Sequence, residues 1–327
     1  MARPDVLVTR PIMDEPLARL RERCDVTVDE NDFGIPREDL LKKVEGRDAL
    51  ITMLTEKVDA ELLAAAGPQL KIVANHAVGF DNVDVADCTA AGVLATNTPD
   101  VLTETTADTA FALLMAAARR VGEGERFLRR REPWIWGPLM MLGQDVHHKT
   151  IGIVGFGRIG QAVARRARGF GMDVIYTDAV TLPPEVEAET GARRVEMKEL
   201  LATADFVSIH TNLTPETRHL FGAEQFRAMK RSGVLVNTSR GPVVDEVALA
   251  DALEEGEIFA AGLDVFEEEP DVNEKLLVLE NAVVIPHLGS ATVDTREAMG
   301  NVAVDNVFAA LDGKRPPTLL NPEAFAG

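Results

Sequence analysis

Residues 151–160 read Ile151-Gly-Ile-Val-Gly-Phe-Gly-Arg-Ile-Gly160, an apolar strand that runs directly into the pattern Gly-x-Gly-x-x-Gly. Apolar residues continue behind the last glycine at roughly helical spacing, and a second apolar run then ends in Asp178. A strand, a glycine-rich turn, a helix and a strand that ends in an acid form the βαβ unit that binds dinucleotides. The segment therefore predicts a parallel α/β domain with a nicotinamide cofactor.

The three glycines have different physical tasks in such a unit. Gly155 permits the tight turn, Gly157 lets the backbone approach a pyrophosphate, and Gly160 allows the helix to pack closely on the strand. Asp178 is suited to accept hydrogen bonds from the adenosine ribose and to repel a 2′-phosphate, and no Arg directly follows it. We therefore expect NAD(H) rather than NADP(H). The alternative is a glycine-rich turn without a ligand.

Short β-branched runs alternate with helical patterns along the whole chain, which is typical of parallel sheets covered by helices. The first series of candidate strands comprises Val6–Thr9, Val26–Val28, Ala49–Met53, Lys71–Ala74 and Val93–Thr96. The second comprises Ile151–Gly155, Val174–Thr177, Phe206–Thr211, Gly233–Asn237, Ala260–Val265 and Ala282–Pro286. We expect two doubly wound α/β domains.

The connections predict where the domains divide. A long apolar helix that begins near Thr103, Thr105 or Thr106 and runs to about Val121 is expected to cross between them. A second helix, roughly Ala291–Leu311, is expected to return to the first domain. The predicted substrate domain is therefore discontinuous, with residues 1–99 and 289–327, and residues 100–288 form the NAD-binding domain.

Composition excludes several classes of protein. The 327 residues carry 34 Lys and Arg against 53 Asp and Glu, a formal charge of -19 that disfavours nucleic acid and anionic lipid as partners. Cys24 and Cys88 lack partners at metal-ligand spacing, and the adjacent pair His147 and His148 has no completing carboxylate, so no metal is expected. No signal peptide or membrane span is predicted, and a reducing cytoplasmic compartment fits best.

Ionisable residues follow the strands of the second series. Ligands of an open parallel sheet lie beyond the carboxyl ends of its strands, where Arg240, Glu269 and His287 are expected. Reduction of a carbonyl needs a proton donor, and an imidazole beside a carboxylate suits that task. The guanidinium offers a rigid fork for a substrate carboxylate. The alternative readings are a solvated Arg, a charged face at 267–269 and an unrelated His.

At this point the chain resembles the D-isomer-specific 2-hydroxyacid dehydrogenase family over essentially its whole length. Within that family it is most similar to glyoxylate and hydroxypyruvate reductases, by residues 98–108, 134–138 and 316–322. The successive family motifs are Asn75–Asp84, Gly155–Gly160, Asn237–Gly241, Gly262–Pro270 and Pro286–Thr292.

The resemblance implies a role for individual residues and an architecture. It implies a flavodoxin-like substrate domain, a Rossmann cofactor domain and a cleft between them that closes on cofactor and oxoacid. His287 corresponds to the acid/base, Glu269 to its partner and Arg240 to the anchor of the substrate carboxylate and carbonyl. The remaining correspondences are substrate-loop amides at Val78 and Gly79, pyrophosphate contacts at Gly157, Arg158 and Ile159, a cofactor contact at Thr106, and a position near the nicotinamide carboxamide at Asp264.

The resemblance also implies NADH-dependent reduction of glyoxylate or hydroxypyruvate to a D-2-hydroxyacid, in a homodimer. The only two tryptophans, Trp134 and Trp136, predict an interface contact, and by resemblance an arm that brings Trp136 near the partner's substrate. Rival functions are phosphoglycerate, phosphite or formate dehydrogenases of the same scaffold, or an NAD(H)-sensing module like the corepressors of this fold. The sequence does not rank the two substrates or give the direction of the reaction.

Overall fold

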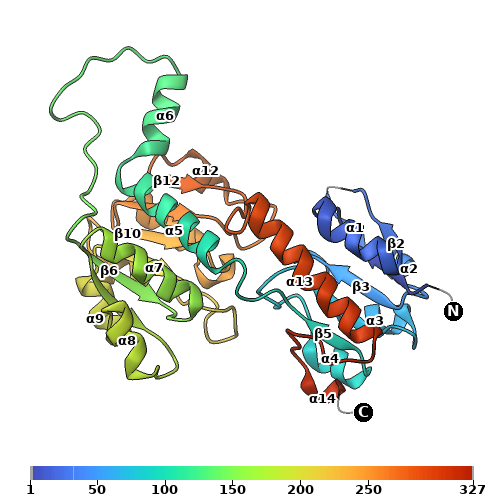
Figure 1. Cartoon of the computed structure of the whole chain (residues 1–327). Helices are drawn as coiled ribbons and strands as arrows, with labels where there is room; N and C mark the ends of the chain where they lie inside the picture. Colours follow the sequence, from blue (N-terminus) through green and yellow to red (C-terminus); the bar gives the residue numbers. More distant parts are fainter. Residues whose placement is uncertain (1–2, 32, 326–327) are drawn as a thin grey trace. The chain divides into compact units, whose positions relative to one another are not determined.

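The computed structural model describes residues 3–31 and 33–325 and divides into two units. Unit 1 comprises Met1–Leu102 and Ala291–Gly327, and unit 2 comprises Thr103–Ser290. Unit 1 is thus discontinuous in the sequence, with its divisions a few residues beyond the expected ones. Both units are α/β with a sheet of parallel strands, as the alternating pattern predicts (Figure 1). Each unit is described by itself below.

Unit 1 is built on a five-stranded sheet in the order β2-β1-β3-β4-β5. Its apolar side chains alternate between two faces: Val6 and Val8 belong to one core cluster and Leu7 belongs to the other. Helices α1 and α13 pack on the Val6 face, while α2, α3 and α4 cover the Leu7 face. The elements are β1 (Asp5–Val8), α1 (Asp14–Arg23), β2 (Asp25–Val28), α2 (Arg37–Lys43), β3 (Ala49–Thr52), α3 (Ala60–Ala66), β4 (Ile72–Asn75), α4 (Val85–Ala90), β5 (Leu94–Thr96), α13 (Val293–Leu311) and α14 (Pro322–Phe325).

Unit 2 contains a seven-stranded parallel sheet in the order β12-β11-β10-β9-β6-β7-β8. Helices α5 and α7 lie side by side on one face, and α9, α10 and α11 cover the other (Figure 1). Its elements are α5 (Thr103–Ala118), α6 (Val121–Arg129), β6 (Thr150–Val154), α7 (Arg158–Gly169), β7 (Asp173–Thr177), α8 (Pro184–Thr190), β8 (Arg193–Arg194), α9 (Met197–Thr203), β9 (Phe206–Ile209), α10 (Ala223–Ala228), β10 (Val234–Asn237), η1 (Gly241–Val243), α11 (Glu246–Glu254), β11 (Ala260–Leu263), α12 (Glu274–Val278) and β12 (Ala282–Val284).

The strand order of unit 2 reverses beside β6. The chain runs outward from β6 to β7 and β8 and then returns to β9 on the other side. The glycine turn directly follows β6, so it lies at the topological switch point, where open α/β sheets bind their ligands. The strands after the switch end at Ile209, Asn237, Leu263 and Val284, which puts the ionisable residues that follow them on the same edge.

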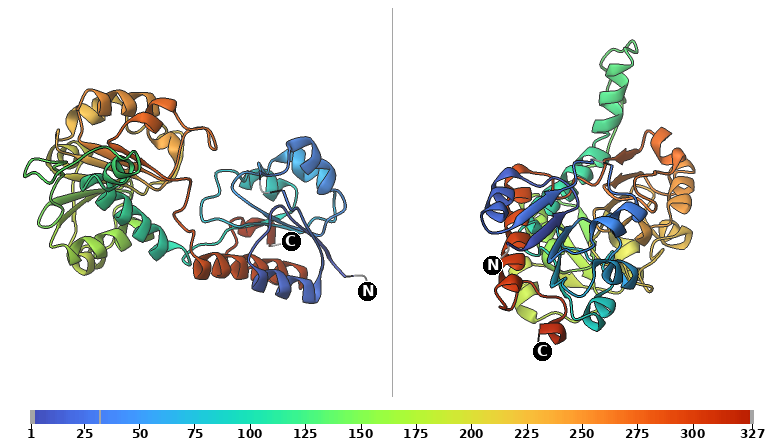
Figure 2. Two further views of the ribbon diagram at one scale, coloured as in Figure 1. Left: turned by 90° about the horizontal axis from the view of Figure 1, so that it is seen from above. Right: turned by 90° about the vertical axis from the view of Figure 1, so that its right-hand side faces the viewer.

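Two details differ from the sequence expectations. The sheet of unit 2 has a strand, β8, that the hydrophobic pattern did not predict, because its two residues are exposed arginines. The helix expected to reach about Val121 ends at Ala118, since Arg120 takes a left-handed conformation with φ 53° and a separate helix α6 begins after it. Helix α6 has no buried residues, and with the coil after it extends away from the sheet of unit 2 (Figure 2).

Candidate active site

The glycine turn of unit 2 has the geometry of a dinucleotide cradle. Gly155 takes φ +88°, and a Cβ there would lie 2.6 Å from the carbonyl oxygen of His210. A Cβ on Gly160 would lie 2.3 Å from the Gly155 oxygen, whereas a Cβ on Gly157 would meet nothing within 4 Å. Helix α7 begins with Gly157 as its N-cap, and the first N–H groups of a helix have no acceptor inside it. The residues present therefore fit a bound dinucleotide diphosphate.

Asp178 lies at the end of β7 and is already engaged with the glycine turn. Its carboxylate accepts hydrogen bonds from the Phe156 N–H at 2.6 Å and the Val180 N–H at 2.8 Å. Each carboxylate oxygen has a further lone pair, so acceptor capacity for a ribose hydroxyl remains. The carboxylate therefore also ties the turn after β6 to the end of β7.

Arg194 reaches this corner from β8 and is not among the residues that the sequence predicts for the site. Its guanidinium donates to the Asp178 carbonyl and to the Thr181 hydroxyl, both at 2.7 Å. Arg194 lies 16 residues after Asp178, and a strand of two arginines carries no apolar pattern that would predict it. The register of β7 with β8, which pairs Tyr176 with Arg194, brings the guanidinium there.

Glu269 and His287 are hydrogen-bonded to each other. The Nδ1 atom of His287 lies 2.8 Å from Oε2 of Glu269, and about a third of each side chain is exposed. Burial on its own raises the pKa of Glu269, but the hydrogen bond from His287 and the charges of His287 and Arg240 outweigh it and hold the pKa below its usual range. The carboxylate is therefore ionised at neutral pH, and the free ring nitrogen of His287 is Nε2.

Asp264 locks the backbone that carries His287. His287 has a backbone φ of 52°, a left-handed conformation that costs free energy for a non-glycine residue. Its N–H donates to the Asp264 carbonyl at 2.8 Å, and the buried Asp264 carboxylate accepts from the N–H groups of Leu288 and Gly289. Burial raises the pKa of Asp264, although these N–H groups and the His287 charge oppose it.

Arg240 is held in a turn built by Asn237 at the end of β10. The Asn237 side chain accepts from the Ser239 N–H at 3.0 Å and donates to the Arg240 carbonyl at 2.9 Å. The next residue, Gly241, approaches the following loop so closely that a Cβ would lie 1.8 Å from the carbonyl carbon of Phe266. Only glycine allows this packing, which brings the Arg240 turn against the loop that carries Glu269.

A further residue of this cluster, Glu246, was not singled out by the sequence. It is buried at the start of α11, and its carboxylate accepts from the Glu267 N–H at 2.6 Å. Burial raises the pKa of Glu246, and the charges of Glu267 and Glu269 act in the same direction. Glu246 thus fixes the 264–273 loop through hydrogen bonds to its backbone. Only the tertiary contact shows this, because an acid at a helix start is ordinarily read as a favourable dipole interaction.

The remaining predicted residues divide between the units. Thr106 is buried in α5 and lies against Gly289, so unit 2 brings it to the Asp264 turn. Val78 and Gly79 lie in unit 1, in the loop after β4. No hydrogen bond among the described residues uses the N–H of Val78, Gly79 or Phe80. Three successive N–H groups without an acceptor are available as donors to an anionic ligand.

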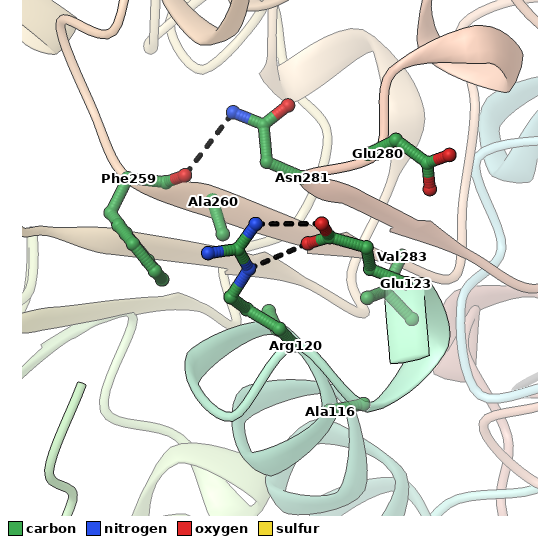
Figure 3. A pocket seen from close by; sticks show the side chains of 9 residues that line it. Ala116, Arg120, Glu123, Phe259, Ala260, Glu280, Asn281 and Val283 are labelled. Carbon is green, nitrogen blue, oxygen red and sulfur yellow. Dashed lines mark hydrogen bonds and ion pairs between the residues drawn. The ribbon is translucent and has the colours of Figure 1, made fainter. Parts of the chain in front are cut away.

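A pocket of about 320 Å³ lies elsewhere on unit 2 and involves none of these residues (Figure 3). Arg120 and Glu123 form a two-pronged ion pair across it, with both N–O distances 2.6 Å. Phe259 and Asn281 directly precede β11 and β12, so the pocket opens at the amino ends of the strands, opposite the edge that carries His287. It therefore belongs to the base of α6 rather than to the candidate active site.

Neither a metal centre nor a membrane-spanning helix is present in the described ranges 3–31 and 33–325. No three or more His, Cys, Asp or Glu side chains are grouped there as metal ligands. No helix in these ranges has both the length and the apolar character needed to cross a membrane.

Comparison with known proteins assigns the chain to a family. The sequence model described as D-isomer specific 2-hydroxyacid dehydrogenase, NAD binding domain, matches residues 111–289. The chain belongs to the D-isomer-specific 2-hydroxyacid dehydrogenase family. As a member of that family it is a nicotinamide-dependent dehydrogenase, which decides between the enzyme and the non-enzymatic binding module in favour of the enzyme.

Individual relatives cover nearly the whole chain. It is 52% identical to a glyoxylate reductase of Thermococcus onnurineus (strain NA1) over 328 residues, which is 99% of this chain and 97% of the relative. The TT0316 protein from Thermus thermophilus superimposes with a TM-score of 0.91 at 46% identity, over 97% and 99% of the two chains. An NADPH-dependent glyoxylate/hydroxypyruvate reductase from Sinorhizobium meliloti, solved with NADP and malonate, has a TM-score of 0.84 at 34% identity, over 99% and 98%.

Proposed function

We propose that this dehydrogenase reduces glyoxylate or hydroxypyruvate with NADH, giving glycolate or D-glycerate. The observation that carries the proposal is the 2.8 Å bond between His287 and Glu269, on the same strand edge as the glycine turn and Arg240. The named activities of the Thermococcus onnurineus and Sinorhizobium meliloti relatives support the substrate class. The D configuration of the product rests on membership of the family.

Arg240 and the amides of the substrate loop bind the oxoacid carboxylate in this proposal. The guanidinium offers a planar fork, and the N–H groups of Val78 and Gly79 offer fixed dipoles. When bound, the reduced nicotinamide supplies the hydride for C2. His287 donates the proton at Nε2 to the carbonyl oxygen, since Nδ1 is committed to Glu269. Glu269 fixes the tautomer and stabilises the imidazolium that donates.

The glycine turn would hold the cofactor, with Gly155, Gly157, Arg158, Ile159 and Gly160 at the pyrophosphate. Thr106 and Asp264 would lie near the nicotinamide, and Asp178 near the adenosine ribose. NADH is favoured over NADPH because the Asp178 carboxylate repels a 2′-phosphate. Arg194 beside the same loop moderates that repulsion, so a measurable secondary use of NADPH is expected.

We further propose that the enzyme is a homodimer that works in the cytoplasm. The arm, residues 121–142, exposes large apolar side chains that a monomer has no reason to carry to this extent: Val121, Leu128, Trp134, Ile135, Trp136, Leu139 and Leu142. Aromatic anchors of this type are favoured at protein interfaces. The two buried, free cysteines are compatible with a reducing compartment.

Steady-state assays test the reaction directly. Purified protein is mixed with glyoxylate, hydroxypyruvate, pyruvate or 3-phosphohydroxypyruvate, each with NADH or NADPH, and cofactor oxidation is followed. We expect the two short oxoacids with NADH to give the highest kcat/KM, and hydroxypyruvate to yield D-glycerate by chiral chromatography. Preference for the phosphorylated substrate would overturn the substrate assignment, and equal kcat/KM with both cofactors would overturn the NADH assignment.

Analytical ultracentrifugation tests the homodimer. The substitution Trp136→Ser is expected to weaken the association of the two subunits.

A further inference from the structure

The substrate loop of unit 1, residues 77–80, has three N–H groups without an acceptor, those of Val78, Gly79 and Phe80. The carbonyls of the same three peptides are all hydrogen-bonded. The carbonyl of Ala77 accepts a hydrogen bond from the Thr98 N–H at 2.8 Å. The Val78 carbonyl accepts from the Asn97 side chain at 2.7 Å, and the Gly79 carbonyl accepts from the Asn75 side chain at 3.0 Å. Three consecutive carbonyls are therefore held from inside unit 1.

Holding these carbonyls also orients the N–H groups. A trans peptide is planar, and its N–H points opposite to its C=O. The carbonyls of Ala77, Val78 and Gly79 thus orient the N–H groups of the residue after each, ending at Phe80. A carbonyl that accepts a hydrogen bond also polarises the N–H of its peptide, which strengthens that N–H as a donor.

The two asparagines that hold the loop are themselves rigidly placed. Asn75 ends β4 and is 1% exposed, and its side-chain oxygen accepts from the Asn82 amide at 3.2 Å. Asn97 directly follows β5 and is 7% exposed, and its carbonyl accepts from the Thr318 hydroxyl at 2.6 Å. The Thr318 bond holds the main chain that carries the Asn97 side chain, and burial leaves both side chains few alternative rotamers, so the loop carbonyls have fixed donors.

Extending the proposed function, on which this inference rests, we propose that Asn97 and Asn75 are positioning residues. Neither touches the substrate: through the Val78 and Gly79 carbonyls they hold the N–H groups of Gly79 and Phe80 ready for the oxoacid carboxylate. Phe80 thereby becomes a third amide donor of the carboxylate site, beyond Val78 and Gly79. Neutral amides suit this task, because they orient the loop without adding negative charge beside an anionic substrate in a chain of net charge -19.

Carboxylate binding to the NADH-bound enzyme tests the inference without relying on turnover. The probe is oxamate, an unreactive carboxylate of similar size, titrated calorimetrically into wild type and into Asn97→Ala, Asn97→Asp and Asn75→Ala. Both Asn97 variants are expected to weaken oxamate binding by about 10- to 100-fold, and to raise KM for glyoxylate in parallel. Asn97→Asp acts strongly because it replaces a donor with a carboxylate that repels the Val78 carbonyl.

A matched control separates positioning from folding. Asn301→Ala also removes side-chain hydrogen bonds in unit 1, to Glu15 and Arg19, but lies on α13 away from the loop carbonyls. It is expected to lower the melting temperature with unchanged oxamate affinity. Affinity for NADH is expected to be unchanged in all variants, since the cofactor residues belong to unit 2.

Three outcomes would overturn the inference: unchanged oxamate affinity in folded Asn97 variants, a loss in Asn301→Ala as large as in Asn97→Ala, or no oxamate binding to wild type. Wild type that binds oxamate but does not reduce glyoxylate would overturn the proposed reaction while the variants still decide the role of the asparagines. Weaker binding in Asn75→Ala as well as in Asn97→Ala supports the extension to Phe80.

Discussion

Units 1 and 2 share a parallel-sheet architecture but present opposite chemistry at the carboxyl ends of their strands. Unit 2 presents ionisable side chains: Arg240, Glu269 and His287 follow its strands. Unit 1 presents backbone N–H groups, which uncharged side chains such as Asn75 and Asn97 hold in place. The His287–Glu269 pair of unit 2 can donate a proton, whereas the loop after β4 in unit 1 offers oriented N–H dipoles.

The histidines express the same difference. His287 in unit 2 has about a third of its side chain exposed and is paired with a carboxylate. His76 in unit 1 is buried beside the substrate loop, and burial, with a smaller contribution from the Arg296 charge, lowers its pKa to about 4. The same doubly wound scaffold thus supports a histidine that donates a proton or a histidine that stays neutral and buried, depending on solvent access and the nearest charge.

Removal of the proton donor should have the largest effect. His287→Ala is expected to lower kcat for oxoacid reduction by about 10²- to 10⁴-fold, because no other imidazole among the described residues is paired with Glu269. Affinity for NADH should be retained. His147→Ala, at an exposed position of the same unit, is the control. Full activity of His287→Ala would remove the chemical contrast between the two units.

Replacing the fork of Arg240 should have the next largest effect. Arg240→Lys is expected to lower kcat/KM for glyoxylate by about 10- to 100-fold, since an ammonium ion cannot give two parallel hydrogen bonds to a carboxylate. Steady-state kinetics with saturating NADH measures this effect. The exposed Arg231→Lys should behave as wild type. If both variants are fully active, the amides of unit 1 alone suffice to bind the substrate.

The pH profile tests the pair in unit 2. The ionised Glu269 stabilises the imidazolium, so Glu269→Gln is expected to move the alkaline limb of kcat/KM to lower pH. Profiles of the variant are compared with those of Glu268→Gln, an exposed neighbour in the same loop. An alkaline limb that stays in place would contradict a working His–Glu pair.

The smallest expected effect concerns the stability of unit 1. The folded-state pKa of His76, about 4, lies below its unfolded value near 6.5, so the unfolded chain binds the additional proton between these pH values. Its contribution to the free energy of unfolding is therefore complete above pH 6.5 and is lost as pH falls toward 4, at about 1.4 kcal/mol per pH unit.

Urea unfolding between pH 4 and 7 measures this slope. His76→Gln is expected to reduce the slope of the unfolding free energy against pH by the contribution of about one proton, whatever the substitution does to the absolute stability. His147→Gln, at an exposed site, should leave the slope unchanged. An identical slope in wild type and His76→Gln would mean that the imidazole is not buried as a neutral group.

Much of the fold could be predicted because parallel strands covered on both faces read as short apolar runs. Each strand of unit 1, and each strand of unit 2 except β8, coincides with such a run. The prediction missed β8, because the pairing of Tyr176 with Arg194 depends on the neighbouring strand and not on local hydrophobicity. It also missed the break at Arg120, whose left-handed backbone has no sequence signal in an arginine.

The candidate site shows the same limit. Arg240, Glu269 and His287 could be singled out because each follows a strand, and strand ends are readable from local patterns. The second roles of Asp264 and Asp178, which hold the His287 turn and the glycine turn, were not predicted. Nor were Glu246 and the two loop asparagines. Gly79 lies four residues after its partner Asn75, but the other partners lie 19 to 27 residues away along the chain, and the sequence carries no local trace of such contacts.

The amino-acid sequence by itself therefore determined the α/β class, the glycine turn and the ionisable residues at the strand ends, since these depend on short-range periodicity and on the chemistry of single side chains. Tertiary structure alone decided which backbone groups are hydrogen-bonded within the protein and which are left available to a ligand. The carbonyls of Val78 and Gly79 accept hydrogen bonds from Asn97, after β5, and Asn75, at the end of β4. The turn that carries His287 donates its N–H groups to Asp264, after β11. The bonds of Asn97 to Val78 and of Asp264 to the His287 turn form only after the sheet has brought separate strand ends together.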